Sequence, residues 1–151
     1  MKIALGSDHA GLSLKKVILN HLNQKEDIET IDVGTYDEER THYPIFAKKA
    51  ADKIINGEAD KAIIMCGTGI GISIAANKVK GIRACACSEP YSAKFSVLHN
   101  NANVLAMGSR VVGTELAKMI VDEWLSTDYE GGRHQTRVDM ITDIENENKL
   151  K

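Results

Sequence analysis

Short apolar runs alternate with helical repeats along almost the whole chain. Five runs have the length of buried strands and are followed by glycine or polar residues: 2–6, 29–33, 62–66, 82–87 and 103–107. Between them, apolar side chains recur every three or four positions, as on one face of a helix. This alternation predicts right-handed βαβ units. We expect a three-layer α/β/α fold with a mostly parallel, five-stranded, Rossmann-like sheet and a C-terminal helix.

The ends of several elements carry recognisable residues. Proline is tolerated in the first turn of a helix, so Tyr43 and Pro44 should open a helix that Asn56 and Gly57 end. Residues 146–151 form a polar tail beyond the last helix. No linker, repeat or low-complexity segment divides the chain. We therefore expect one domain over residues 1–151.

The composition of the chain limits its expected binding partners and its expected location in the cell. The 151 residues are 43% hydrophobic and 26% charged, as in an ordinary globular domain. The formal net charge of −2 gives no reason to expect a nucleic acid or an anionic membrane as partner. The apolar start is too short for a signal peptide, and no run could span a bilayer, so we expect a cytoplasmic protein. The cysteines are odd in number and lack zinc-type spacing, which argues against a disulfide framework: Cys66, Cys85 and Cys87.

The most informative stretch is the apolar run that ends at Cys66 and continues into Gly67, Gly69 and Gly71. Glycines after a buried strand let the backbone approach a ligand closely. Ile70 begins a helix whose free N–H groups and positive dipole end face the loop, so the loop should bind an anion. The same environment should favour the thiolate of Cys66. An anion site beside an activated thiol is typical of a reaction centre.

Three familiar patterns do not fit this loop. A P-loop needs Lys and then Ser or Thr after its second glycine, where the chain has Ile72 and Ser73. A dinucleotide fingerprint needs a glycine at position 72, and a cysteine phosphatase needs an arginine there. A tight strand–helix turn with an ordinary buried Cys66 therefore explains this stretch alone as well as a reaction centre does.

Other polar residues follow the first and fifth strands. In a parallel sheet, ligands bind beyond the carboxyl ends of the strands, so these residues should lie near the Cys66 loop. Asp8 and His9 follow the first strand and form a pair capable of acid–base chemistry, and Arg110 follows the fifth. For Asp8, capping of the first helix is the favoured alternative.

A second set of candidates belongs to the last helices. His99 lies at the end of a helix, where a histidine is more often a partner of the helix dipole. Arg133 and Arg137 share one face of the final helix, and together with Arg110 they could bind a phosphate. Pairing with surface carboxylates is the alternative for each arginine. No metal site is expected, because the other histidines have no ligand-like spacing: His21, His42 and His134.

Five motifs lie in order over nearly the whole chain: GSDHAG at 6–11, RTHYP at 40–44, CGTGIG at 66–71 with AANK at 75–78, CSEPYSA at 87–93 and GGRHQ at 131–135. Together they resemble the ribose-5-phosphate isomerase B family, which includes allose- and galactose-6-phosphate isomerases. The resemblance implies interconversion of D-ribose 5-phosphate and D-ribulose 5-phosphate through an enediolate, without metal or cofactor, in the non-oxidative pentose phosphate pathway. It also implies a homodimer or a dimer of dimers whose sites are shared between subunits.

The resemblance also implies a role for each candidate residue. Cys66 would be the base that moves the C2 proton, and Thr68 would assist at the enediolate oxygens. His99, with Asp8 nearby, would open the furanose ring. Backbone N–H groups of the loop would hold the enediolate charge: Gly67, Gly69, Ile70 and Gly71. The remaining residues would bind the phosphate (His9, Arg110, Arg133 and Arg137) or line the sugar (Tyr43 and Asn100).

Differences between branches of the family indicate which type of isomerase the chain resembles. One branch lacks the cysteine and uses a glutamate where this chain has Ile72, so that branch is excluded. Galactose-6-phosphate isomerases divide the site residues between two different chains, whereas Cys66, His99 and Arg133 all lie on this one. The homomeric ribose type is favoured, with allose 6-phosphate as a further candidate substrate. A phosphosugar sensor without turnover is the competing hypothesis, and an assay for conversion distinguishes the two.

Overall fold

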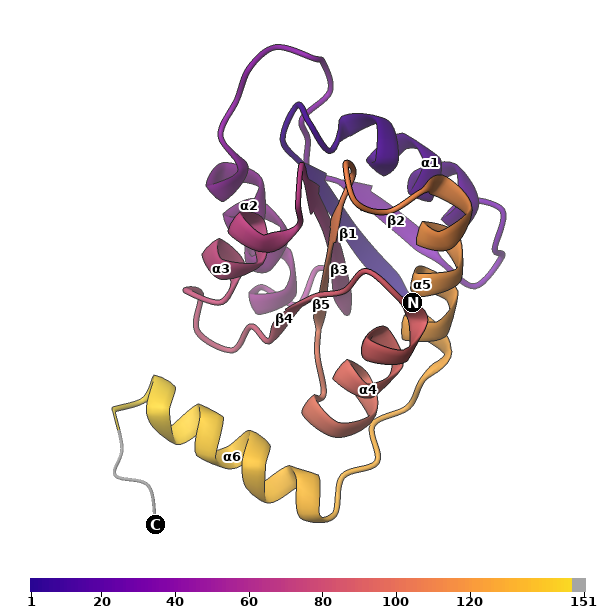
Figure 1. Ribbon diagram of the computed structural model, residues 1–151. Coiled ribbons are helices and arrows are strands. Elements are labelled where there is room, and N and C mark those ends of the chain that lie inside the picture. The colour runs from indigo at the N-terminus through magenta and orange to yellow at the C-terminus, as the bar shows by residue number, and fades with distance from the viewer. Residues whose placement is uncertain (148–151) are drawn as a thin grey trace.

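A five-stranded sheet forms the middle layer of the described part of the chain (Figure 1). Its strands are β1 (Lys2–Ser7), β2 (Glu29–Asp32), β3 (Lys61–Cys66), β4 (Ala84–Ala86) and β5 (Val104–Gly108). The structure, a computed structural model, describes residues 1–147, and in this part of the chain every strand pair is parallel, in the order β2-β1-β3-β5-β4. The predicted fold class is confirmed.

Helices cover both faces of the sheet. They are α1 (Leu12–Leu22), α2 (Tyr43–Ile55), α3 (Ile70–Ala76), α4 (Pro90–Asn100), α5 (Thr114–Ser126) and α6 (Arg133–Glu145). Side chains of α1, α4 and α5 share one buried cluster with the sheet, and those of α2 and α3 share the other. The C-terminal helix α6 lies outside these layers and packs against α4 (Figure 1). No helix in the described residues is long and apolar enough to cross a membrane.

The alternation of side chains along β3 creates the two buried clusters. Ile63 and Met65 point into the cluster that contains Trp124 of α5, whereas Ile64 and Cys66 point into the other. Successive residues of a strand face opposite sides of the sheet, so both sides of β3 must be apolar. The second cluster is rich in alanine, and the thiol of Cys66 therefore lies on the α2/α3 side of the sheet.

The fourth strand is shorter than predicted. The sequence predicts a strand over residues 82–87, but β4 covers only Ala84–Ala86 at the edge of the sheet. Just before it, the Arg83 N–H donates to the side chain of Asn103 at 2.8 Å, so it takes no part in the ladder. Part of the predicted polar tail, residues 148–151, lies outside the described residues.

The strand order opens a crevice between β1 and β3. The chain moves outward from β1 to β2 and then crosses back to β3 on the other side of β1. The loops that follow β1 and β3 therefore lead away from each other at the carboxyl edge of the sheet. This is where ligands bind in open α/β sheets.

Candidate active site

A cleft of about 570 Å³ lies at the carboxyl ends of β1 and β3. Loops after β1, β3 and β5 and the start of α2 form its walls. Its lining residues are Asp8, His9, Ala10, Arg40, Tyr43, Cys66, Gly67, Thr68, Gly71 and Arg110. Sequence reasoning names all of these as candidates except Ala10 and Arg40. The fold thus brings the candidates that follow β1, β3 and β5 into one cleft.

Cys66 lies at the base of this cleft and is only 5% exposed. The backbone N–H of Gly69 donates to its Sγ at 3.2 Å, a contact that favours negative charge on the sulfur. The hydroxyl of Thr68 accepts from the N–H of Ile70 at 3.3 Å. Gly69 and Ile70 belong to the loop without lining the cleft, and the side chain of Ile70 is exposed.

Backbone contacts fix the loop after β3 against the loop after β5. Ser109 donates its N–H to the Cys66 carbonyl at 2.9 Å, and Arg110 donates to the Gly67 carbonyl at 3.0 Å. The Ser109 hydroxyl donates to the Ala10 carbonyl at 2.6 Å, which joins the loop after β1. Hydrogen bonds therefore join three loops that are distant in the sequence around the thiol.

Asp8 and His9 are held by backbone amides. Asp8 is 6% exposed, and its carboxylate accepts from the N–H of Gly11 at 3.0 Å. It stabilises the turn before α1 rather than α1 itself, whose N-cap residue is Gly11. The N–H of Thr41 donates to Nδ1 of His9 at 3.2 Å, so Nε2 carries the proton and is the donor that His9 can offer to an anion.

The other two cysteines lie outside the cleft in less favourable surroundings. Burial, together with the neighbouring Cys85 and Glu89, raises the pKa of Cys87 to about 12. Burial also raises the pKa of Cys85. Both side chains therefore stay protonated thiols near neutral pH, as small residues of the interior.

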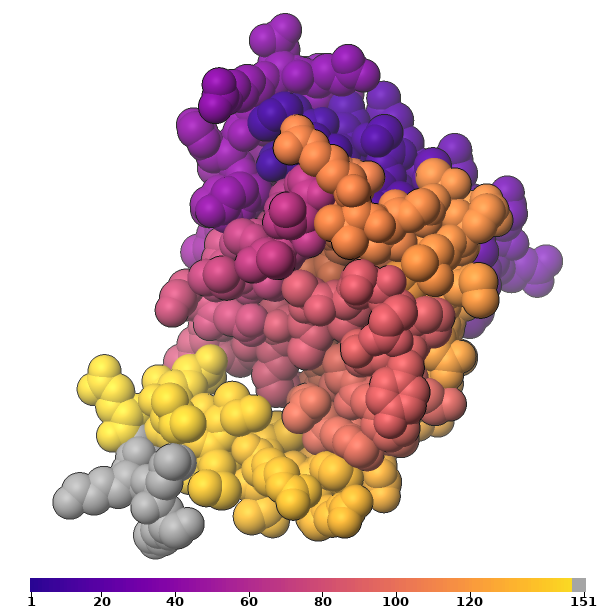
Figure 2. All heavy atoms as spheres, viewed as in Figure 1, coloured from indigo at the N-terminus to yellow at the C-terminus, as the bar shows by residue number. Residues whose placement is uncertain are grey.

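The remaining candidates lie near the amino ends of the strands, opposite the cleft. His99 and Asn100 end α4 just before β5, whose first residue, Val104, pairs with the start of β3. Arg133 and Arg137 are exposed on α6. Figures 1 and 2 show α6 at one end of the molecule and the N-terminal loops at the other. A single chain therefore does not bring these four residues to Cys66, and the predicted grouping of Arg110 with the α6 arginines does not form within it.

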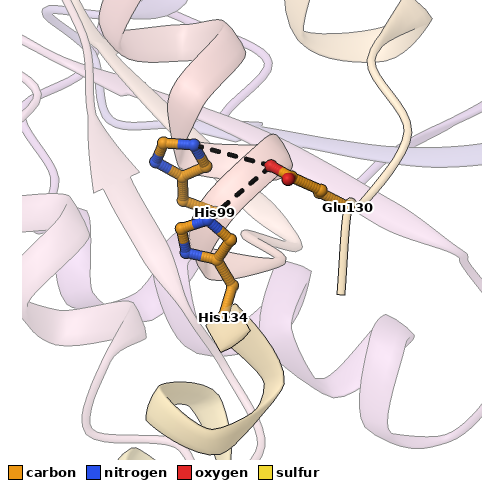
Figure 3. Close-up of side chains that lie close together, drawn as sticks. All are labelled: His99, Glu130 and His134. Atoms are coloured by element: carbon orange, nitrogen blue, oxygen red, sulfur yellow. Dashed lines mark ion pairs between the residues drawn. The ribbon is translucent and has the colours of Figure 1, made fainter. Parts of the chain in front are cut away.

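His99 takes part in a cluster that sequence reasoning missed. Its ring stacks on that of His134, with 4.0 Å between centroids and 8° between planes, and both face Glu130 (Figure 3). Arg133 Nε lies 3.4 Å from Nε2 of His134, and Arg137 Nη1 lies 3.5 Å from its Nδ1. Burial lowers the pKa of His134, and the charge of His99 lowers it further. Only the packing of α6 on α4 brings these residues together, so no local pattern reveals the cluster.

The donor atoms of His99, Glu130 and His134 lie within 4.8 Å of one another, close enough for a metal site. Imidazole nitrogens bind transition metals through lone pairs that lie in the ring plane. Because the two rings are stacked almost in parallel, these lone pairs point side by side rather than toward one ion. A metal ion would fit only after one ring left the stack.

A larger hollow, of about 750 Å³, lies at the amino edge of the sheet. Its walls include Met1, Ile28 and the second half of α5. It has neither a glycine-rich loop nor a thiol, and it lies away from the carboxyl ends where such sheets bind ligands. The smaller cleft at Cys66 is the candidate active site.

Comparisons with known proteins show what the chain as a whole is similar to. The sequence matches the Ribose/Galactose Isomerase family over residues 3–141. Ribose-5-phosphate isomerase B of Escherichia coli K12 is 60% identical over 144 residues, which cover 95% of this chain and 96% of that protein. The solved structure of ribose-5-phosphate isomerase B from Clostridium thermocellum has a TM-score of 0.95 and 52% identity, and covers 97% of this chain and 99% of that one. The Mycoplasma genitalium enzyme, solved with bound ribulose 5-phosphate, has a TM-score of 0.91 and 42% identity, over 97% of each chain.

Gly69→Ala should lower both stability and activity. Gly69 has φ +79°, and an added Cβ would lie 2.8 Å from the Met107 carbonyl carbon. The left-handed backbone alone costs about 1–2 kcal/mol for an alanine, and relief of the clash would move the N–H that contacts Cys66. Gly113→Ala is the control, because its φ is −69° and nothing lies within 4 Å of the added Cβ. Equal unfolding free energies for the two variants in urea would contradict the prediction.

His134 should make the protein less stable in acid. Burial lowers its pKa in the folded chain, so the unfolded chain binds a proton near the ordinary value of about 6.5 while the folded chain does not. The stability is present above that value and is lost as the pH falls toward the lowered one. We expect the melting temperature of the wild type to fall more than that of His134→Gln between about pH 7.5 and pH 5.5. The exposed His42→Gln serves as control and should follow the wild type.

Proposed function

The chain belongs to the Ribose/Galactose Isomerase family and is a sugar-phosphate isomerase, and we propose that it interconverts D-ribose 5-phosphate and D-ribulose 5-phosphate in the non-oxidative pentose phosphate pathway. The observation that carries the proposal is the cleft, which combines a thiol, a carboxylate and an imidazole with the N–H groups of a glycine-rich loop. The test is conversion of ribose 5-phosphate by purified protein, followed by NMR with EDTA present. A sugar-phosphate sensor would bind the same compound without converting it.

Cys66 is the proposed base. It takes the proton from C2 of the open-chain aldose, and the electrons of the C–H bond form an enediolate with negative charge on the C1 oxygen. Return of the proton to C1 and transfer of the C2 hydroxyl proton to the C1 oxygen give the ketose. Hydrogen moves within the substrate, so no external electron acceptor is consumed. Thr68 and the N–H groups of Gly67 and Gly71 stabilise the enediolate oxygens, an effect of a few kcal/mol per donor in other enzymes.

In the proposed complex, positively charged and imidazole side chains bind the phosphate of the substrate. His9 and Arg110 line the cleft and bind phosphate oxygens from one subunit. Arg133 and Arg137 supply guanidinium groups from a neighbouring subunit, where both are exposed on α6. Guanidinium groups match the oxygen geometry of a phosphate. Tyr43 contacts the sugar from the first subunit, and Asn100 contacts it from the second.

A site shared between two copies of the chain is part of the proposal. In one copy, the end of α4 and the end of β3 lie at opposite edges of the sheet, so His99 can reach the substrate only from a second copy. A twofold dimer contains two such sites. Whether two dimers join into a tetramer stays a prediction, as do a cytoplasmic location and the absence of a metal or cofactor.

Cys66→Ala should abolish isomerisation and leave the fold intact. Removal of a general base normally lowers kcat by about 10²-fold or more. Cys87→Ala is the matched control, since that thiol is equally buried but lies outside the cleft. Retention of more than about a tenth of the wild-type kcat by Cys66→Ala would remove this thiol from the role of base.

Subunit mixing tests the shared site. Cys66→Ala and His99→Asn should each be inactive, but a hybrid dimer contains one site with both wild-type residues. Complete exchange of equal amounts should restore about a quarter of the wild-type activity. Cys66→Ala mixed with Asp8→Asn is the control, because both residues line the same cleft of one chain and no hybrid site has both. If native mass spectrometry shows exchange and the first mixture stays inactive, the site is not shared.

A further inference from the structure

Aromatic and charged groups flank His99 at the end of α4. Phe95, one turn earlier, packs edge-on at 4.8 Å between ring centroids, and His134 of α6 stacks on the ring at 4.0 Å. His134 itself is only 5% exposed. Two contacts of this kind limit rotation of the imidazole about its side-chain bonds. Such restraint suits a group that must keep one orientation.

Glu130 lies at the nitrogen edges of both imidazoles (Figure 3). Its Oε2 is 3.8 Å from Nε2 of His99 and 3.6 Å from Nε2 of His134. The backbone N–H of Glu130 donates to the carbonyl of Leu98 at 3.1 Å, so its main chain is tied to the residue next to His99. The carboxylate is therefore held at the end of α4, although its side chain is 54% exposed.

We propose that Glu130 and His134 are positioning residues for His99 in the ring-opening step. The proposal rests on the proposed isomerase function and deepens it. A carboxylate beside Nε2 selects the neutral tautomer with its proton on that nitrogen, which leaves the lone pair of Nδ1 for the substrate. His134 keeps the ring in place by stacking. The arrangement follows the logic of a carboxylate–imidazole pair in serine proteases.

The ring-opening step then balances without another reactant. Nδ1 of His99 takes the proton of the C1 hydroxyl, and the bond between C1 and the ring oxygen breaks as the C1 carbonyl forms. The imidazolium gives a proton to the ring oxygen and returns to the neutral state. Between the two transfers, the negative charge of Glu130 stabilises the imidazolium. Arg133 and Arg137, which flank His134, bind the phosphate in the proposed complex, and the guanidinium of Arg83 is bonded to the carbonyls of Asn100 and Asn101.

The experiment separates ring opening from proton transfer at carbon. Conversion of ribose 5-phosphate needs both steps, whereas exchange of the C1 hydrogen of ribulose 5-phosphate with D₂O needs only the enediolate. For Glu130→Gln, we expect conversion to fall at least about 10-fold and the exchange rate to stay within about threefold of the wild type. The ¹⁵N spectrum of His99 should also show the proton distributed between Nδ1 and Nε2, rather than held on Nε2.

Two further comparisons complete the test. Glu123 of α5 also pairs with α4, the helix that carries His99, through Lys94. Glu123→Gln removes this carboxylate and should change neither rate. His134→Phe keeps a flat ring in the stack and should retain most of the conversion that His134→Ala loses. Equal losses of conversion and exchange in Glu130→Gln, or equally inactive Phe and Ala variants at position 134, would overturn the positioning role. Absence of both reactions in the wild type would instead overturn the proposed function.

Discussion

The contact between the loop after β3 and the end of β5 determines the geometry of the whole cleft. The two backbones approach so closely that a Cβ on Gly108 would lie 2.6 Å from the Thr68 carbonyl. The close approach lets Ser109 and Arg110 bond to the carbonyls of Cys66 and Gly67. It also turns the N–H of Gly69 toward the thiol. Without this packing, the strands could still form a sheet, but the thiol would lose its amide donor.

The fold and the two separate halves of the candidate site follow from local patterns in the sequence. The strand that ends at Cys66 and its glycine loop are short-range features, and so is the helical spacing of Arg133 and Arg137. Local patterns do not predict the cluster around His134 or the presence of Arg40 in the cleft. Both depend on how α6 packs against α4 and on the path of the loop before α2, which no short-range pattern encodes. The sequence predicts too long a β4 for a similar reason. The N–H of Arg83 donates to the side chain of Asn103, a contact that no short-range pattern encodes.

The direction of the helices explains why one chain holds only half of the proposed site. In a βαβ unit the helix runs back against the strands, so residues at its end lie at the amino edge of the sheet. His99 is such a residue, whereas Cys66 ends a strand at the carboxyl edge. No side-chain movement can span the length of the strands, which separates the two edges. Under the proposed mechanism, assembly is therefore a condition for ring opening, and dissociation of the subunits separates the base from the ring-opening group.

The three cysteines show that position in the fold, rather than burial, gives this site its chemistry. Cys66 and Cys87 are hidden from solvent to the same degree, at 5% and 6% exposure. The sulfur of Cys66 accepts from an amide N–H, whereas the thiol of Cys87 faces the carbonyl oxygen of Cys85 at 3.9 Å and lies near the Glu89 carboxylate. An amide hydrogen favours negative charge on sulfur, and carbonyl and carboxylate oxygens oppose it. Two equally buried thiols therefore have different neighbours: an amide N–H faces the sulfur of Cys66, whereas carbonyl and carboxylate oxygens lie near that of Cys87.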